Sequence, residues 1–538
     1  MAENKSFKKQ TFLQGAAVLA AATAIVKIIG AIYKIPLQNI IGKAGYGYFG
    51  TAYNVYDVLL MISTTGLPVA MSRMISESQT LEHHDQIRKI FSTALRVFLL
   101  LGIIGTAGML LFAQPLSAMF HNGEDVAWFA IACLAPAVLV VCVIAAFRGF
   151  FQGQSNMTPT SVSQVFEALC KLIVGLVLAW ILMKLTDGSE TFGAGGAILG
   201  VTIGCLISML YLAWCYRRAI RDLPHGGPVK STMDTMKTLL AIAIPITLGS
   251  AGLQIINLVD AVVYMRRLVN AAGVSTIRAD ELKGIYEFCR TIFNLPGAFI
   301  TPIVISIIPA ITSHLTMKNQ RGVRMVEGSA LRITGLIAAP CAFGLLSLSK
   351  PIVDLLTSNY NEADLQVGGL ILGLLGLTVI FNSVILVTNA MMQAHGDVTT
   401  PVVNMIAGGV IKVIINFVLV GIPSLNIVGA AIGTLICYVV IMVMNITAMG
   451  RKQSIDLRSL RGLLKPLLAA ALMGAVAYMA NGVLSRFLGS SLGCLGAIGV
   501  AGVTYVILVL AFRIITYEDC MLLPAGEKIA KILRVRGE

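Results

Sequence analysis

The chain has 538 residues, of which 57% are hydrophobic and only 12% charged, and its mean hydropathy is +0.84. This composition excludes a water-soluble globule with an ordinary charged surface. The apolar runs last about 20 residues or more, the length of a membrane-spanning helix, and they lack the alternation of β-barrel strands. The sequence therefore predicts an all-α, multi-pass membrane protein.

The formal net charge is +14. Most lysines and arginines lie in loops between apolar runs, where the positive-inside rule and anionic lipid headgroups account for them, so we expect no nucleic-acid partner. The cysteines lie mostly within apolar runs and form no C-x-x-C motif, and no H-E-x-x-H motif occurs. Such cysteines are typical of small buried side chains. We predict no metal and no other cofactor.

With about 20 apolar residues as the spanning length, about fourteen spans follow one another. They are expected near residues 12–35, 47–72, 90–113, 126–150, 159–184, 194–216, 238–265, 284–313, 328–349, 366–392, 399–420, 425–449, 463–485 and 492–515. Because the loops on the side of the N-terminus hold most of the basic residues, both termini are predicted to be cytoplasmic. The segment from Tyr517 onward mixes apolar and basic residues and predicts an amphipathic helix on the cytoplasmic leaflet.

Two stretches of the chain resemble each other. Residues 147–178 align without a gap with residues 388–419, so that Lys171 meets Lys412. About six spans separate the two copies. Because this number is even, the halves share one orientation and are related by a pseudo-two-fold axis along the membrane normal, an arrangement found in transporters.

The repeat divides the chain into three parts. Six spans form an N-terminal lobe at 1–222, and six more form a C-terminal lobe at 223–455. Two additional spans and the amphipathic tail occupy 456–538. In transporters built from repeats the substrate path lies at the interface between them.

Ionisable side chains inside spans indicate function, because each costs roughly 2.5–3.5 kcal/mol to insert and needs a partner, a watery cavity or a path to the interface. Cations outnumber acids among them, so we expect a basic cavity and an anionic substrate group. The candidate substrate-binding residues are Lys27, Asp57, Arg73, Glu167, Lys171, Asp260, Glu287, Arg290 and Lys412.

These candidates also have structural interpretations. Lys27 could extend to the interface, or face a cavity with Asp57 as its partner. Arg73 follows a predicted kink at 66–68 and could be a cytoplasmic anchor. Pro296, with two further prolines in the eighth span, predicts another bend.

Glu167 and Lys171 are four residues apart and could form an intrahelical ion pair. Lys412 has no acid at the corresponding position, which favours a binding site. The three remaining candidates could instead form structural pairs between neighbouring helices; they are Asp260, Glu287 and Arg290.

Residues 286–313, YEFCRTIFNLPGAFITPIVISIIPAITS, carry the pattern Y-x3-R-x4-LP…P-x3-S-x2-PA, and the segments KIIGAIYKIPLQNIIGKAGYGYF and GLPVAMSRMISE are equally informative. On these segments the chain resembles the MurJ/stage V sporulation protein B (YtgP-like) branch of the multidrug/oligosaccharidyl-lipid/polysaccharide exporter superfamily. The resemblance extends over essentially the whole chain. It implies two six-helix lobes, two extra helices, alternating access and a bacterial plasma membrane.

The resemblance also implies export of an undecaprenyl-pyrophosphate-linked precursor, which is lipid II in the MurJ case. MurJ proteins tend to have arginine where this chain has the first-span lysine, and a lysine lacks the bidentate fork of arginine. The family's interior charges correspond to Lys27, Asp57, Arg73, Asp260 and Arg290.

The sequence thus favours a flippase that exports lipid II for peptidoglycan synthesis. The alternatives are a flippase for another lipid-linked polysaccharide and a cation-coupled multidrug exporter, which should have a more acidic and aromatic cavity. The longest loops lack paired acids or a His/Asp set, so we predict no enzyme. Coupling is expected to the membrane potential, Na⁺ or H⁺. The expected partners are the lipid-linked oligosaccharide and membrane lipids, with cell-wall synthases as further candidates, and the chain is expected to be a monomer.

Overall fold

The computed structural model describes residues 12–452 and 462–514, and the predicted amphipathic tail lies outside them. Within these residues the chain forms helices α1–α16 and no strand. Ten stretches of the described residues are long and apolar enough to cross a membrane. The predicted all-α membrane fold is confirmed, and the cytoplasmic position of both termini stays a prediction.

Two of the helices contain two spans each. α1 (Phe12–Thr64) breaks at Gly42, which has φ 76° and ψ −179°, and α16 (Leu464–Ala511) breaks at Gly489, which has φ 80° and ψ 170°. Only glycine adopts this backbone region without strain. With these double crossings, and with α8 and the α9–α10 segment counted, the helices account for the predicted set of about fourteen spans.

Both predicted kinks are confirmed. The chain bends at Thr65 before α2 (Gly66–Thr80), and it is interrupted at 294–295 between α9 (Thr276–Phe293) and α10 (Pro296–Thr316). In both places a proline lies in the first turn of the following helix. Proline is tolerated there because its missing N–H would have no partner within the helix.

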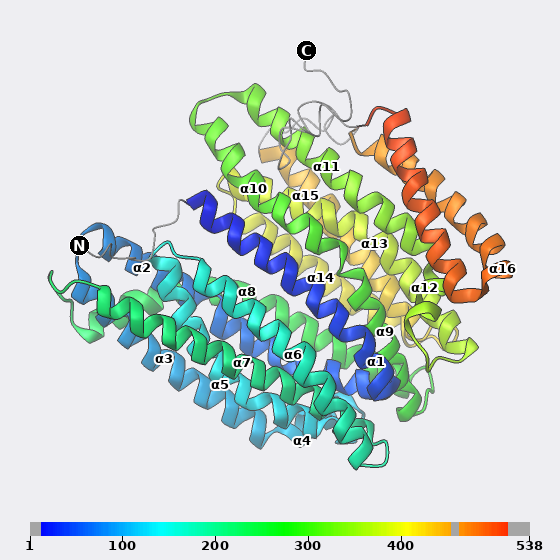
Figure 1. Ribbon diagram of the computed structural model, residues 1–538, viewed down its shortest axis with the longest axis horizontal. Coiled ribbons are helices and arrows are strands. Elements are labelled where there is room, and N and C mark those ends of the chain that lie inside the picture. Colours follow the sequence, from blue (N-terminus) through cyan, green and yellow to red (C-terminus); the bar gives the residue numbers. More distant parts are fainter. Residues whose placement is uncertain (1–11, 453–461, 515–538) are drawn as a thin grey trace, which may run out of the picture. The chain divides into compact units, whose positions relative to one another are not determined.

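The chain divides into two compact units, residues 1–287 and 288–538. This division reflects contacts within each unit and not the sequence repeat. The predicted lobe boundaries at 222 and 455 therefore stay a prediction. In the first unit α7 packs along α6 and α5, α5 packs on α3, and α1 contacts α5, α6 and α8 (Figure 1). The bounds are α3 His84–Leu111, α4 Ala113–Phe120, α5 Trp128–Gly153, α6 Thr158–Leu185, α7 Glu190–Asp222 and α8 Thr232–Asn270.

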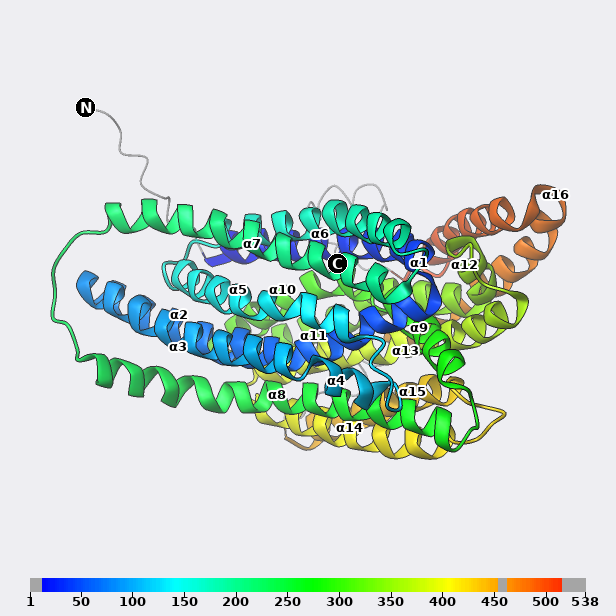
Figure 2. The ribbon, with the colours of Figure 1, turned by 90° about the horizontal axis from the view of Figure 1, so that it is seen from below.

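In the second unit α11 packs against α10, α13 and α16, and α15 packs against both α13 and α14 (Figure 2). A buried apolar core joins α10, α11, α13 and α15, with Ile311, Val387 and Met391 fully buried in it. The bounds are α11 Gln320–Ser347, α12 Ser349–Leu356, α13 Glu362–Ala394, α14 Thr399–Leu419 and α15 Val428–Lys452.

Helix lengths support the internal repeat. α3 and α11 both have 28 residues, and each is followed by a helix of 8 residues, α4 or α12. α6 begins at Thr158 and α14 at Thr399, two residues that the alignment of 147–178 with 388–419 pairs. Lys171 and Lys412 therefore occupy equal positions along corresponding helices.

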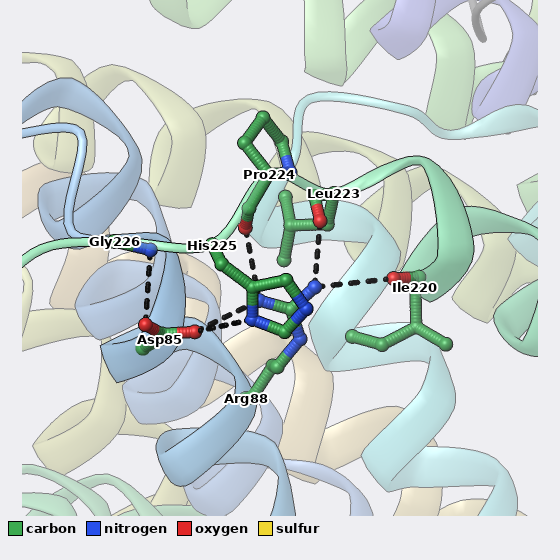
Figure 3. A network of polar contacts seen from close by, with 7 residues as sticks. All are labelled: Asp85, Arg88, Ile220, Leu223, Pro224, His225 and Gly226. Carbon is green, nitrogen blue, oxygen red and sulfur yellow. Dashed lines mark hydrogen bonds and ion pairs between the residues drawn. The ribbon is translucent and has the colours of Figure 1, made fainter.

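The connection between α7 and α8 runs as an extended segment and is fastened to the start of α3 (Figures 2 and 3). Asp85 accepts hydrogen bonds from the Gly226 N–H (2.9 Å) and from His225 Nδ1 (3.1 Å). The Arg88 guanidinium lies within 3.0 Å of Asp85 Oδ1 and donates to the backbone carbonyls of Ile220, Leu223 and Pro224. Asp85 and Arg88, one turn apart at the start of α3, thus hold residues 220–226, where this connection begins.

Replacing Arg88 by alanine should free this connection, because three carbonyls lose a charged donor. A hydrogen bond to a charged group contributes about 1.5–3 kcal/mol, so proteolysis within residues 223–231 should become about tenfold faster or more. Limited proteolysis followed by mass spectrometry measures the rate. Lys89→Ala, one residue along the same helix, is the matched control; equal cleavage of both variants would contradict the attachment.

The break at Gly42 combines a left-handed backbone with a close contact, since a Cβ there would collide with the Glu190 carboxylate. At Gly489 the backbone is similar but nothing lies within 4 Å of such a Cβ. The Glu190 side chain would have to turn away and lose the hydrogen bond that it accepts from the Gly45 N–H at 3.0 Å. Gly42→Ala should therefore destabilise the protein more than Gly489→Ala, which carries only the backbone strain of about 1–3 kcal/mol.

Thermal unfolding of the purified protein in detergent orders these variants. Gly30→Ala is the control, because Gly30 lies inside α1 with open space around it, and alanine there should stabilise the helix by about 0.5–1 kcal/mol. Equal melting temperatures for the Gly42 and Gly489 variants would show that the Glu190 contact does not matter.

Candidate functional site

Lys171 on α6 lies within the first unit, bound to aromatic side chains of α1. Its ammonium donates a hydrogen bond to the Tyr53 hydroxyl at 2.7 Å. It also lies over the rings of Tyr53 and Tyr33, 4.9 Å and 5.2 Å from their centroids. Tyr33 is fully buried, and its hydroxyl donates to the Ala197 carbonyl at 3.2 Å. Cation–π contacts and the hydrogen bond offset the loss of hydration that burial imposes on the lysine.

Glu167, one turn before Lys171, forms its ion pair with another helix. Its carboxylate accepts a hydrogen bond from Arg148 of α5 at 3.0 Å, and the same guanidinium donates to the Ser163 hydroxyl at 3.3 Å. The intrahelical pair with Lys171 is therefore wrong, because Lys171 points to Tyr53 and Arg148 reaches Glu167 from α5. The sequence does not single out Arg148, because a cation at the end of an apolar run is typical of the boundary between a span and a loop.

Asp57 lies half-buried on α1, one turn beyond Tyr53. Both Asp57 and Glu167 are close enough to Lys171 to act on it electrostatically. The structure thus brings together three of the predicted site residues, Asp57, Glu167 and Lys171. We name the surrounding group the Lys171 cluster: Tyr33, Tyr53, Asp57, Arg148, Glu167 and Lys171.

The other candidates of the first unit lie at separate places. Lys27 is exposed on α1, on a stretch that also exposes Ile28 and Ile32. Arg73 is exposed on α2, and Asp260 is buried in α8 with 3% of its surface exposed. Their roles in binding stay predictions.

Glu287 and Arg290 lie one turn apart on α9, and both are half-buried. The Glu287 side chain packs on Gly50 of α1, where an added Cβ would lie 3.1 Å from Glu287 Cγ. Lys412 is half-buried on α14. One turn before it, at the position of Glu167, stands Gly408, which packs tightly against Ile441.

The two halves build different polar networks at corresponding positions. Arg148 and Ser163 of the first half align with Asn389 and Asn404 of the second. In the second half Asn445 of α15 takes the central place: it donates to Asn389 Oδ1 at 2.8 Å and accepts from Asn404 Nδ2 at 2.8 Å. A charged pair in one half is thus replaced by neutral amides in the other.

A second buried network was missed because its members lie far apart in the sequence. His121, in the connection between α4 and α5, contacts Asp280 Oδ1 through Nδ1 at 2.5 Å and Thr51 Oγ1 through Nε2 at 3.0 Å. Lys283 donates to the same Thr51 hydroxyl and lies over the Phe120 ring, 4.9 Å from its centroid. We name Thr51, His121, Asp280 and Lys283 the His121 network. The only sequence signal for this network is that Asp280 and Lys283 are three residues apart, in a segment between two predicted spans.

The sequence and the fold are similar to those of known membrane proteins. The family described as "Polysaccharide biosynthesis protein" matches residues 12–314. The uncharacterized membrane protein YabM of Bacillus subtilis (strain 168) is 28% identical, with all of this chain and 99% of that protein covered. The lipid II flippase MurJ of the same organism is 25% identical, with 88% of this chain and 89% of that protein covered. A solved structure of the lipid II flippase MurJ in an inward closed conformation has a TM-score of 0.66 at 16% identity, covering 92% of this chain and 98% of that one.

The fold is that of a multi-pass membrane protein, and the relatives that share it are named as flippases and transporters. The family match covers more than half of the chain. The chain belongs to the polysaccharide biosynthesis protein family, and the resemblance deduced from its first, second and eighth spans is confirmed.

If Arg148 and Glu167 form a structural pair, exchanging their charges should restore what each single change removes. Arg148→Glu or Glu167→Arg alone leaves two like charges adjacent in a partly buried place and should destabilise by about 1–3 kcal/mol. The double variant should recover most of this loss. Melting temperatures in detergent measure it. Glu167→Lys with Lys171→Glu is the contrasting exchange and should not recover, because Tyr53 holds Lys171.

Proposed function

We propose that this protein is a flippase that moves an undecaprenyl-pyrophosphate-linked cell-wall precursor from the inner to the outer leaflet by alternating access. Lipid II is the proposed substrate. The observation that carries the proposal is similarity along nearly the whole chain to a protein named lipid II flippase. The shared fold with the solved MurJ structure agrees with it. A flippase for another lipid-linked polysaccharide is the nearest alternative.

The physical requirement for such a protein is a polar path for the headgroup. A sugar diphosphate cannot cross about 30 Å of hydrocarbon unaided, since each unpaired polar group costs several kcal/mol there. The isoprenoid tail can remain in lipid throughout. Interior cations at equal positions in the two halves, Lys171 and Lys412, support a site for the diphosphate.

The surroundings of Lys171 suit this role. An ammonium group has three N–H donors, and the Tyr53 hydroxyl takes one of them, so others remain for phosphate oxygens. The aromatic rings orient the ammonium without neutralising it, unlike an adjacent carboxylate. In this proposal the cations Lys27, Arg73, Arg290 and Lys412 complete the phosphate contacts as the lobes rock.

The acids would set the energetics of the cycle. We propose that Asp57, Glu167, Asp260 and Glu287 balance the interior cations when no substrate is bound. The membrane potential, worth about 2.3 kcal/mol per charge per 100 mV, could then drive an anion outward, or Asp57 or Asp260 could bind Na⁺ or H⁺. The protein is proposed to act as a monomer in the plasma membrane, surrounded by lipid.

Replacing Lys171 by alanine should reduce flipping of labelled lipid II in reconstituted vesicles by about tenfold or more, because one desolvated charge contact to the diphosphate is lost. Lys184→Ala, at the far end of the same helix where the lysine lies over Trp180 at 4.0 Å, is the matched control and should be neutral. Wild-type rates in the Lys171→Ala protein would remove this lysine from the mechanism.

The same vesicles separate the candidate substrates. Lipid II, an undecaprenyl-diphosphate carrying a different oligosaccharide, and a cationic dye are compared in parallel at equal protein density. Movement of the first supports the proposal, and movement of the second alone supports the other flippase. Movement of the dye alone would support a drug exporter and contradict the proposal.

A further inference from the structure

The His121 network forms a continuous hydrogen-bond relay between a buried cation and a buried acid. Lys283 donates to Thr51, Thr51 contacts His121 Nε2, and His121 Nδ1 contacts Asp280. The side chain of His121 is fully buried, and Thr51, Asp280 and Lys283 expose no more than 2% of their surface. Every link is made between groups withdrawn from water, and the transport mechanism proposed above uses none of them.

The relay can exist in two protonation states. When His121 is neutral, the Thr51 hydroxyl can donate to Nε2 while Nδ1–H donates to the Asp280 carboxylate. When His121 is protonated, both ring nitrogens are donors, and Thr51 must turn its hydroxyl to the Gly47 carbonyl, 3.1 Å away. Thr51 then accepts from both Lys283 and His121. The site can therefore take up one proton with every hydrogen bond satisfied.

The cost of that proton is electrostatic. A protonated His121 would place two cations, His121 and Lys283, beside one fully buried carboxylate, Asp280. The other groups around the network are Tyr48 of α1, whose ring lies 5.3 Å from that of His121, the exposed Glu124 on the side of His121 and the half-buried Glu287 on the side of Lys283. Exposed and half-buried acids balance a buried charge only weakly.

The network also lies at the contact between α9 and α1. Asp280 and Lys283 lie on α9, the helix that passes from the first compact unit into the second at 287–288. Its first half lies in backbone contact with α1, since a Cβ on Gly47 would be 2.8 Å from the Asp280 carbonyl. The hydroxyl of Thr276 at the start of α9 donates to Glu124 Oε1 at 3.2 Å. The His121 network thus closes the contact between α9, α1 and the α4–α5 connection.

We propose that the His121 network is a proton-binding site, and that uptake of one proton at His121 loosens the attachment of the first half of α9 to α1. The site is separate from the Lys171 cluster and does not depend on the identity of the transported substrate. In the orientation predicted from the loop charges, this end of the first unit faces the outside of the cell, so the site would respond to external acidity.

The direction of the effect follows from the folded environment. Burial, the largest cause, lowers the pKa of His121 below its ordinary value; the hydrogen bond to Asp280 opposes this shift and the charge of Lys283 adds to it. A histidine whose pKa is lower in the attached state stabilises that state fully above its ordinary pKa of about 6.5. The stabilisation is lost as the pH falls from that value towards the lowered one.

Hydrogen–deuterium exchange of the full-length protein in detergent tests this proposal. After correction for intrinsic exchange rates, exchange of residues 276–287 should rise about fivefold between pH 7.5 and 5.5. His121→Gln, which cannot be charged, should abolish the rise. His225→Gln replaces an exposed histidine of the α7–α8 connection and should leave it unchanged. A rise of equal size in the His121→Gln protein, or no rise in the wild type, would overturn the proposal.

Asp280→Asn provides a second measurement if His121→Gln does not fold. Removing the carboxylate lowers the affinity of His121 for the proton, so the midpoint of the exchange profile should shift to lower pH by about one unit. An unchanged midpoint would again overturn the proposal. Failure of lipid II flipping alone would not, because exchange is measured without substrate.

Discussion

The first unit depends on hydroxyl groups that replace water as hydrogen-bond acceptors for two interior lysines. Lys171 and Lys283 come from different helices, and each donates to a hydroxyl of α1, Tyr53 in one case and Thr51 in the other. Residues two apart on a helix point about 200° away from each other, so these hydroxyls lie on nearly opposite faces. α1 therefore stands between α6 and α9 and receives one cation from each side. Without such acceptors neither ammonium could remain in an interior of low dielectric.

Much of this architecture could be predicted from the sequence because it depends on local rules. The length of the apolar runs predicts the helices, and the prolines predict the breaks before α2 and α10. The gapless alignment predicts that Lys171 and Lys412 occupy equal positions. The partners of the charges could not be predicted in the same way. Spacing alone favoured Glu167 with Lys171, but α5 packs close enough for Arg148 to reach Glu167, and α1 offers Tyr53 to Lys171. Tertiary packing decides such pairings, and the spacing of residues along the chain does not show which helices pack together.

The His121 network shows the same limit more strongly. Its links join residues that are 70, 159 and 232 positions apart. From sequence, Lys283 belongs to a polar connection, since the segment before the eighth span carries several charges. In the structure α9 begins at Thr276, so this segment is helical, and one of its faces turns Lys283 inward while Arg278 and Glu281 pair near the surface. Helical periodicity, not composition, decides which of these charges are buried.

The repeat preserves the backbone and the interior lysine but not the groups around it. Arg148, Ser163 and Glu167 have Asn389, Asn404 and Gly408 as their counterparts, and an asparagine of α15 supplies the missing hydrogen bonds. A neutral amide network costs less to bury than an ion pair and does not respond to charge nearby. At these positions the first half therefore keeps an ionic contact that a nearby anion or a proton can alter, whereas the second half has amides that carry no charge and do not titrate. The second half keeps a charged contact at another position of the same segment, where His395 Nε2 lies 3.0 Å from Glu327 Oε1. The two halves therefore place their ionisable contacts at different positions of one shared backbone.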